Sequence, residues 1–145
     1  MDALIDKIKI SPSLLGKLIE TDINKSTDSE LKNSLEKNGY LFLRNIINSD
    51  EIETAKNDVF KRLNEVNELK EPYKDGISSG NSNRDEMYNN RGDFWESVSS
   101  IKSLRQVTNG KSLENVFSKI FGSPSIGFDF IFLRAVAGGK FTHMH

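Results

Sequence analysis

The alternation of residues 126–133 constrains the fold more than any other feature of this sequence. Every second position is apolar along this stretch, at Ile126, Phe128, Phe130 and Phe132. A period of two that is rich in aromatic residues is typical of a β-strand. The intervening positions Ile131 and Leu133 are also apolar, as in a strand of a sheet that is covered on both faces. We therefore expect a strand here, with its phenylalanine stripe packed in a core.

Helical patterns precede this strand. Thr27-Asp28-Ser29-Glu30 has the spacing of a capping box, in which the first and last side chains exchange hydrogen bonds with each other's backbone N–H groups. The helix that it predicts ends at Asn38-Gly39, because glycine adopts the left-handed conformation after a last turn without a steric clash. A second helix is predicted at about 49–67, where apolar residues recur at steps of three and four and acidic residues occupy the first turn.

Two shorter helices are expected in the second half of the chain. One ends at Asn109-Gly110, and Ser112 is predicted to cap the next, which Gly122 closes. The apolar positions expected to face inward are Ile101, Leu104 and Val107 in the first of these helices and Leu113, Val116, Phe117 and Ile120 in the second.

The remaining segments have weaker patterns. Residues 40–43 are short, aromatic and apolar, which predicts a buried strand directly after the first helix. Residues 68–95 show no periodicity and include the polar, glycine-containing run 76–83. A loop of this length in a compact domain is usually functional or disordered.

Composition excludes several classes of protein. The 145 residues have a formal net charge of -1 and a pI of about 6.1, whereas nucleic-acid-binding domains are usually basic. The sequence contains no cysteine, which excludes disulfides and thiolate metal sites from it. No stretch approaches the roughly 18 apolar residues of a membrane span, and the first residues lack the apolar region of a secretory signal. We expect a soluble, cytoplasmic protein that binds neither nucleic acid nor a membrane.

The predicted elements are typical of an α+β domain whose sheet has only begun. Residues 1–25 are interpreted as an N-terminal arm and residues 26–145 as the N-terminal part of one domain. Gly138-Gly139 is a predicted turn, and a further strand is expected over 140–145. Since the helices come first and the sheet follows, we expect the sequence to be the front part of a longer protein.

One motif near residue 133 points to a known family. Leu133-Arg134-Ala135, then Gly138, then Thr142-x-x-His145, together with the preceding order of elements, resembles the phytanoyl-CoA dioxygenase family over about residues 30–145. The resemblance implies a double-stranded β-helix, a jelly-roll or cupin-like fold that this sequence enters but does not complete. It also implies a non-haem iron(II)/2-oxoglutarate-dependent dioxygenase that hydroxylates a small organic substrate.

The same resemblance assigns a metal ligand. In the family this histidine opens a His-x-Asp pair, so the resemblance places an iron ligand at His145. A 2-His-1-carboxylate triad holds iron(II) on one side and leaves positions open. The carboxylate, the second histidine and the residue that clamps 2-oxoglutarate belong to positions beyond 145. We therefore expect the isolated chain to be inactive. A hydroxylase is favoured over a halogenase because hydroxylases are commoner, and the residue that separates them is not in the sequence.

Two other interpretations remain open. His143 and His145 form a His-x-His pair such as begins the metal site of cupins, although the spacing from Gly138 is one residue shorter than in that pattern. Alternatively, the chain is a non-enzymatic interaction module in which the helix at 49–67 and its neighbours present a binding face. Taken without its context, His145 would be an ordinary histidine of a strand.

Several charged residues invite a chemical role. We expect Arg134 to be structural, with Asp129 as a possible ion-pair partner. The acidic residues Asp85, Glu86 and Asp93 lie in a polar loop and are expected to be solvated. Four large side chains of that loop, by analogy with the family, are expected near the mouth of the substrate cavity: Arg84, Met87, Tyr88 and Arg91.

Overall fold

The computed structural model describes residues 4–5 and 8–133 of the chain. The described strands are β1 (Leu4–Ile5) and β2 (Ile8–Lys9), an antiparallel pair in which Leu4 faces Lys9 and Ile5 faces Ile8. A 3-10 turn, η1 (Pro12–Leu14), follows. The six helices of the described part are α1 (Asp28–Asn38), α2 (Ser49–Glu65), α3 (Arg84–Met87), α4 (Arg91–Ser99), α5 (Lys102–Asn109) and α6 (Lys111–Phe121), with a second 3-10 turn, η2 (Tyr73–Asp75), before α3.

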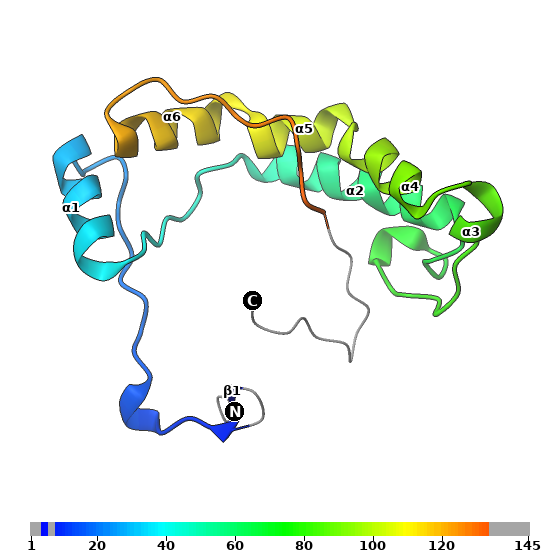
Figure 1. Cartoon of the computed structure of the whole chain (residues 1–145), viewed down its shortest axis with the longest axis horizontal. Coiled ribbons are helices and arrows are strands. Elements are labelled where there is room, and N and C mark those ends of the chain that lie inside the picture. The colour runs from blue at the N-terminus through cyan, green and yellow to red at the C-terminus, as the bar shows by residue number, and fades with distance from the viewer. Residues whose placement is uncertain (1–3, 6–7, 134–145) are drawn as a thin grey trace.

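The helices form a curved row rather than a closed bundle (Figure 1). α1 packs against α6 at one end, α2 packs along α5 in the middle, and α3 and α4 lie at the other end. Residues 8–19 lead away from the helices, and the segment after α6 runs back along α6 and α5 (Figure 1).

Two groups of buried side chains lie at the two ends of this row, and Ala55 of α2 and Leu104 of α5 are buried in its middle. The first consists of Leu63, Val66, Phe94 and Val98, where the end of α2 meets α4, and the second of Leu31, Val116 and Ile120, where α1 meets α6. We call these the α2–α4 cluster and the α1–α6 cluster. Because each burial site is small, the stability of each end of the row depends on few side chains.

The helix predictions are confirmed at most boundaries. Thr27 and Glu30 form the predicted capping box, and Gly39 ends α1 with a φ of 74°. α2 begins at Ser49 and ends at Glu65, within two residues of its predicted end. α5 ends at Asn109 and Gly122 closes α6.

Two predictions about α6 are wrong. Gly110 is its N-cap and no side chain caps it; Ser112 lies one position inside the helix and is exposed. Phe117, expected to face inward, is also exposed. Only Gly110 separates α5 from α6. α6 therefore begins at Lys111, two residues before the start that a Ser112 cap predicts.

The two predicted strands do not form in the described residues. At 40–43 the backbone makes one parallel bridge, between Phe42 and Glu20, while Leu41 and Leu43 pack against the α1–α6 cluster. Residues 126–133 pair with no strand of the described part, and the phenylalanine stripe expected in a core is exposed to solvent. Alternation shows which residues share a face, but a strand also needs a partner for its backbone.

The long loop predicted at 68–95 is ordered in the structure. Leu69 and Ser78 form an antiparallel bridge around η2, α3 follows, and α4 already begins at Arg91. Phe94, inside the predicted loop, is fully buried. The predicted end of the loop is wrong, because α4 begins at Arg91. Contacts of this segment with α2 are not recorded by hydrophobic periodicity.

Candidate functional site

The proposed metal ligand His145 lies outside the described residues, as do Arg134, His143 and the predicted strand at 140–145. Within residues 4–5 and 8–133, no three His, Cys, Asp or Glu side chains are placed to hold a metal ion. No helix of this part of the chain is long and apolar enough to cross a membrane.

Serine hydrogen bonds fix the start of the segment that leads into the motif. The Ser125 N–H donates to Ser118 Oγ at 2.9 Å, and Ser125 Oγ donates to the carbonyl of Glu114 at 2.7 Å. Both acceptors belong to α6, so the chain is turned back along this helix as soon as it leaves it.

Side chains of α5 hold the next residues of the segment. Asn109 Nδ2 donates to the carbonyl of Phe128 at 2.9 Å, and the Arg105 guanidinium donates to the carbonyl of Asp129. A Cβ atom at Gly127 would lie 2.4 Å from Asn109 Nδ2, so glycine lets the backbone approach this side chain. Asp129 itself is exposed, and Arg134, its expected partner, is outside the described residues.

The two faces of the segment have different surroundings. Ile131 and Leu133 are half-buried, and Leu133 packs against the α2–α4 cluster. A cavity of about 490 Å³ separates this part of the segment from α4 and α5, and its lining includes Trp95, Arg105 and Phe130. Leu133 is thus anchored on the helices, next to a cavity whose lining includes aromatic rings and one guanidinium.

The guanidinium of Arg84, a residue predicted near a substrate mouth, lies over two aromatic rings. Its guanidinium carbon lies 4.5 Å from the ring centre of Phe94 and 4.4 Å from that of Trp95, and the group pairs with the Glu68 carboxylate. Arg84 Nε is buried without an acceptor in the described part of the chain. The geometry fits a structural clamp that joins the segment after α2 to α4.

Tyr88 belongs to a second group of arginine contacts that joins two segments of the chain. Arg62 Nη2 donates to Tyr88 Oη at 2.7 Å and to Ser97 Oγ at 2.8 Å, while Nη1 pairs with Glu65. These bonds join α2 to Tyr88, which precedes α4, and to Ser97 within α4. Of the other predicted mouth residues, Met87 is exposed, and the Arg91 side chain is not among those described.

The acidic residues of this region behave as a polar surface. Asp85, Glu86 and Asp93 are all exposed, as expected for solvated carboxylates. We find in their arrangement no support for a general acid–base pair.

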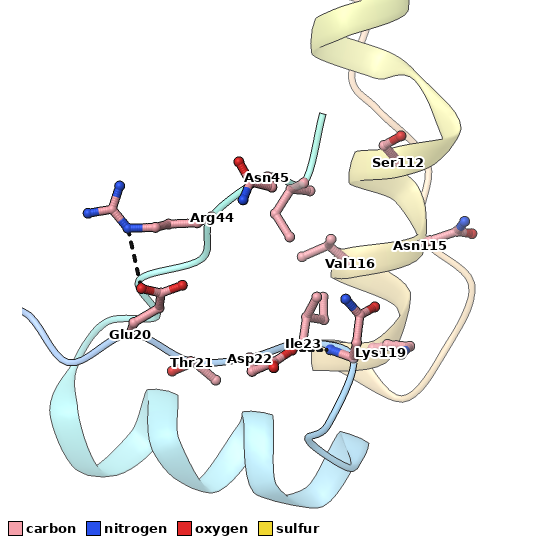
Figure 2. Close-up of a pocket in the computed structure, with 12 residues that line it drawn as sticks. Glu20, Thr21, Asp22, Ile23, Arg44, Asn45, Ser112, Asn115, Val116 and Lys119 are labelled. Atoms are coloured by element: carbon pink, nitrogen blue, oxygen red, sulfur yellow. Dashed lines mark hydrogen bonds and ion pairs between the residues drawn. The ribbon is translucent and has the colours of Figure 1, made fainter. Parts of the chain in front are cut away.

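Sequence reasoning missed a groove of about 500 Å³ between α6 and two segments, residues 20–24 and 44–46 (Figure 2). Its floor is apolar, since Ile23 and Ile46 face Val116 of α6. Polar side chains surround this floor: Glu20, Thr21, Asp22, Asn24, Arg44, Asn45, Ser112, Asn115 and Lys119. No motif marks these residues, because the groove forms only when segments far apart in sequence meet.

Charges at this groove are largely neutralised locally. Arg44 Nε lies 3.3 Å from Glu20 Oε2 (Figure 2), and the Arg44 guanidinium also lies over the Phe42 ring. The Asn24 backbone N–H, followed by the Lys25 ammonium, holds the pKa of Asp22 below its ordinary value. Asn115 and Lys119 point away from Arg44 (Figure 2). The groove therefore offers a polar rim but no set of side chains converging on one atom.

Comparisons with known protein families, curated proteins and solved structures find no match to this chain.

Proposed function

We propose that the chain is the front part of a non-haem iron(II)/2-oxoglutarate-dependent dioxygenase that hydroxylates a small organic substrate. The observation that carries the proposal is the motif of Leu133-Arg134-Ala135, Gly138 and Thr142-x-x-His145. The motif follows residues 126–133, whose apolar side chains at every second position are a pattern typical of strands, although the segment pairs with no strand in the described residues. We propose a cytoplasmic location because a sequence without cysteine fits a reducing compartment.

The described structure is compatible with this assignment in one specific way. Serine, asparagine and arginine side chains fix the segment of residues 125–129 on α5 and α6, and Leu133 is packed against the α2–α4 cluster. The motif therefore starts from a defined position beside the helices. A metal site needs such support, because its ligands must be held in place before the metal binds.

His145 is the proposed metal ligand of this chain. An imidazole suits iron(II), and two further ligands would complete the facial triad. Bound iron and 2-oxoglutarate would supply the oxidation chemistry, while the protein supplies orientation and a water-poor cavity. Because a single imidazole is a weak metal site, the proposal places activity in the protein encoded by the whole reading frame and not in residues 1–145 alone.

The test uses that whole protein and two matched histidine variants. With iron(II), 2-oxoglutarate and ascorbate, we expect succinate release that His145→Ala abolishes and His143→Ala leaves in place. His143 is the matched control because it is the same residue type two positions earlier. No succinate from the folded wild type, or equal activity in both variants, would disprove the assignment. Loss in both variants would favour the cupin-type His-x-His site.

A second candidate function has an observation of its own. Large apolar side chains are exposed on the described surface near α6, including Phe121, Ile126 and Phe128. Exposed patches of this kind mark interaction sites in many proteins, which favours a non-enzymatic interaction module. Such a protein would bind a partner with unchanged affinity after His145→Ala, and it would show no dependence on iron(II).

A further inference from the structure

An apolar surface lies where the chain leaves α6 and turns back. It consists of Phe117, Phe121, Ile126 and Phe128, which are 45% to 91% exposed, and we call it the aromatic patch. Phe117 and Phe121 stack with their ring centres 5.8 Å apart. A cavity of about 240 Å³ opens among these side chains. This volume is below the roughly 300–1,000 Å³ of small-molecule pockets, so an inserted side chain of a protein fits it better than a free ligand.

The N-terminal arm offers a second exposed apolar surface. Leu14, Leu15, Leu18 and Ile19 are 50% to 78% exposed. Residues 8–18 project away from the helices (Figure 1), and hydrogen bonds of the residues that follow hold the chain to the helical part. The Ile19 N–H donates to Tyr40 Oη at 3.0 Å and the Thr21 N–H to the carbonyl of Phe42 at 2.9 Å.

The arm and the aromatic patch of one chain lie on different sides of α6. Residues 20–24, near the end of the arm, line the groove beside Val116 and Lys119, whereas Phe117 and Phe121 belong to the patch. At 3.6 residues per turn these two sets lie on nearly opposite faces of the helix. An arm would have to wrap around α6 to reach the patch of its own chain, whereas the patch of a second copy is open to it.

From this arrangement we propose that two copies of the chain exchange arms, each laying its leucines on the aromatic patch of the other. When one two-fold axis relates the copies, such reciprocal contacts cover the arm and the aromatic patch of both. At roughly 200 Å² for a large apolar side chain, patch and arm together present on the order of 1,000 Å² per copy. A stable interface buries about 800 Å² per partner, so the exposed area suffices for a dimer. The proposal does not depend on the oxygenase function.

The first experiment measures mass in solution. Sedimentation equilibrium of the full chain should show a dimer that Leu18→Ser weakens and Phe121→Ser weakens to a similar extent. Ile77→Ser removes an equally exposed apolar side chain away from both surfaces and should leave the dimer intact. If Phe121→Ser disturbs the folding of α6, Leu18→Ser still tests the contact, because the arm lies outside the helices. A monomer at all concentrations overturns the proposal.

The second experiment identifies the contact. The chain has no cysteine, so Leu18→Cys in one copy and Phe121→Cys in another place single thiols on the two surfaces. After mixing and mild oxidation, we expect disulfides between the two different copies and few with Ile77→Cys as the partner. A dimer linked mainly through two Phe121→Cys residues would show patch-to-patch pairing instead. In a chain that carries both Leu18→Cys and Phe121→Cys, a disulfide that leaves the product the size of a monomer would show that the arm folds back on its own chain. Either result overturns arm exchange.

Discussion

Two arginines in this protein make the same contacts in different surroundings. Arg84 pairs with Glu68 and lies over Phe94 and Trp95, while Arg44 pairs with Glu20 and lies over Phe42. Side-chain exposure is 19% for Arg84 but 60% for Arg44. Water screens the exposed pair and competes for its hydrogen bonds, so the half-buried arginine should contribute much more to stability.

The two Arg→Lys variants test this difference. Lysine keeps the charge but loses the planar group, which in Arg84 lies over two rings. We expect Arg84→Lys to lower the free energy of unfolding by about 1–2 kcal/mol, and Arg44→Lys to change it by no more than about 0.5 kcal/mol. Urea unfolding of the wild type and both variants measures the effect. Similar losses in the two variants would show that burial is not what distinguishes them.

The sequence marks Arg84 as unusual but does not reveal its role. A large residue in a polar loop is visible from composition alone. Its partners Glu68, Phe94 and Trp95 lie before and after it in the chain, and only the tertiary structure brings them together. Family analogy predicts that this residue lies near a substrate mouth, and its observed contacts join α4 to the segment after α2.

The junction between α5 and α6 depends on a single glycine. A Cβ atom at Gly110 would lie 1.9 Å from the carbonyl oxygen of Gln106, and the residue is buried. Its φ of -78° is open to any residue, so space rather than backbone conformation requires glycine here. The sequence predicted a helix end at this position, but the reason for the glycine could be read only from the packing.

Gly110→Ala should therefore separate the two helices. We expect the variant to lose about 1–3 kcal/mol of stability, as overpacked sites do. Gly16→Ala is the matched control, because a Cβ atom there meets nothing within 4 Å. Thermal unfolding followed by circular dichroism compares the three proteins. If Gly110→Ala had the same melting temperature as the wild type, α5 and α6 could shift apart with little loss of stability.

The capping box of α1 gives the helix a defined dependence on pH. The Glu30 carboxylate accepts from the Thr27 N–H at 2.7 Å and from the Thr27 hydroxyl at 2.9 Å. These bonds, the backbone one first, lower the pKa of Glu30 below its ordinary value of 4.5. Since the folded state prefers the ionised form, the stabilisation is present above the ordinary pKa and is lost as the pH falls through the lowered one.

A comparison with Glu30→Ala measures this contribution. The stability difference between wild type and variant should be largest above about pH 4.5 and should shrink on acidification. Glu36→Ala removes another exposed carboxylate of α1 without touching the cap, so it should not reproduce this profile. Urea unfolding at a series of pH values provides the measurement. A difference that is constant with pH would mean that the carboxylate does not act as the cap.

Local signals predicted the helices, and non-local pairing limited the rest. Thr27, Glu30 and Gly39 act on backbone groups within one turn, so their spacing alone located both ends of α1. Phe128 and Phe130 also have a clear local pattern, but a strand forms only with a neighbour that the pattern does not specify. The groove beside α6 has no sequence signal, because three distant segments create it.

Two separate clusters imply that the molecule has two ends of independent stability. Leu31, Val116 and Ile120 are buried at the α1–α6 end, and Phe94 with Val98 is buried at the α4 end. Regions that share few buried contacts can open separately, and single transitions are then not guaranteed even in a short chain. The only tryptophan of the sequence, Trp95, packs against the α2–α4 cluster, so its fluorescence reports on one end alone.

Leu31→Ala and Phe94→Ala should therefore act on different probes. Leu31→Ala removes a fully buried side chain at a cost of about 2–5 kcal/mol, and it should lower the urea midpoint seen by circular dichroism more than the midpoint seen by Trp95 fluorescence. Phe94→Ala should lower the fluorescence midpoint most, because the ring of Phe94 contacts Trp95 directly. If each substitution moved both midpoints equally, the row of helices would unfold as one unit, and α2 with α5 would have to transmit stability between its ends.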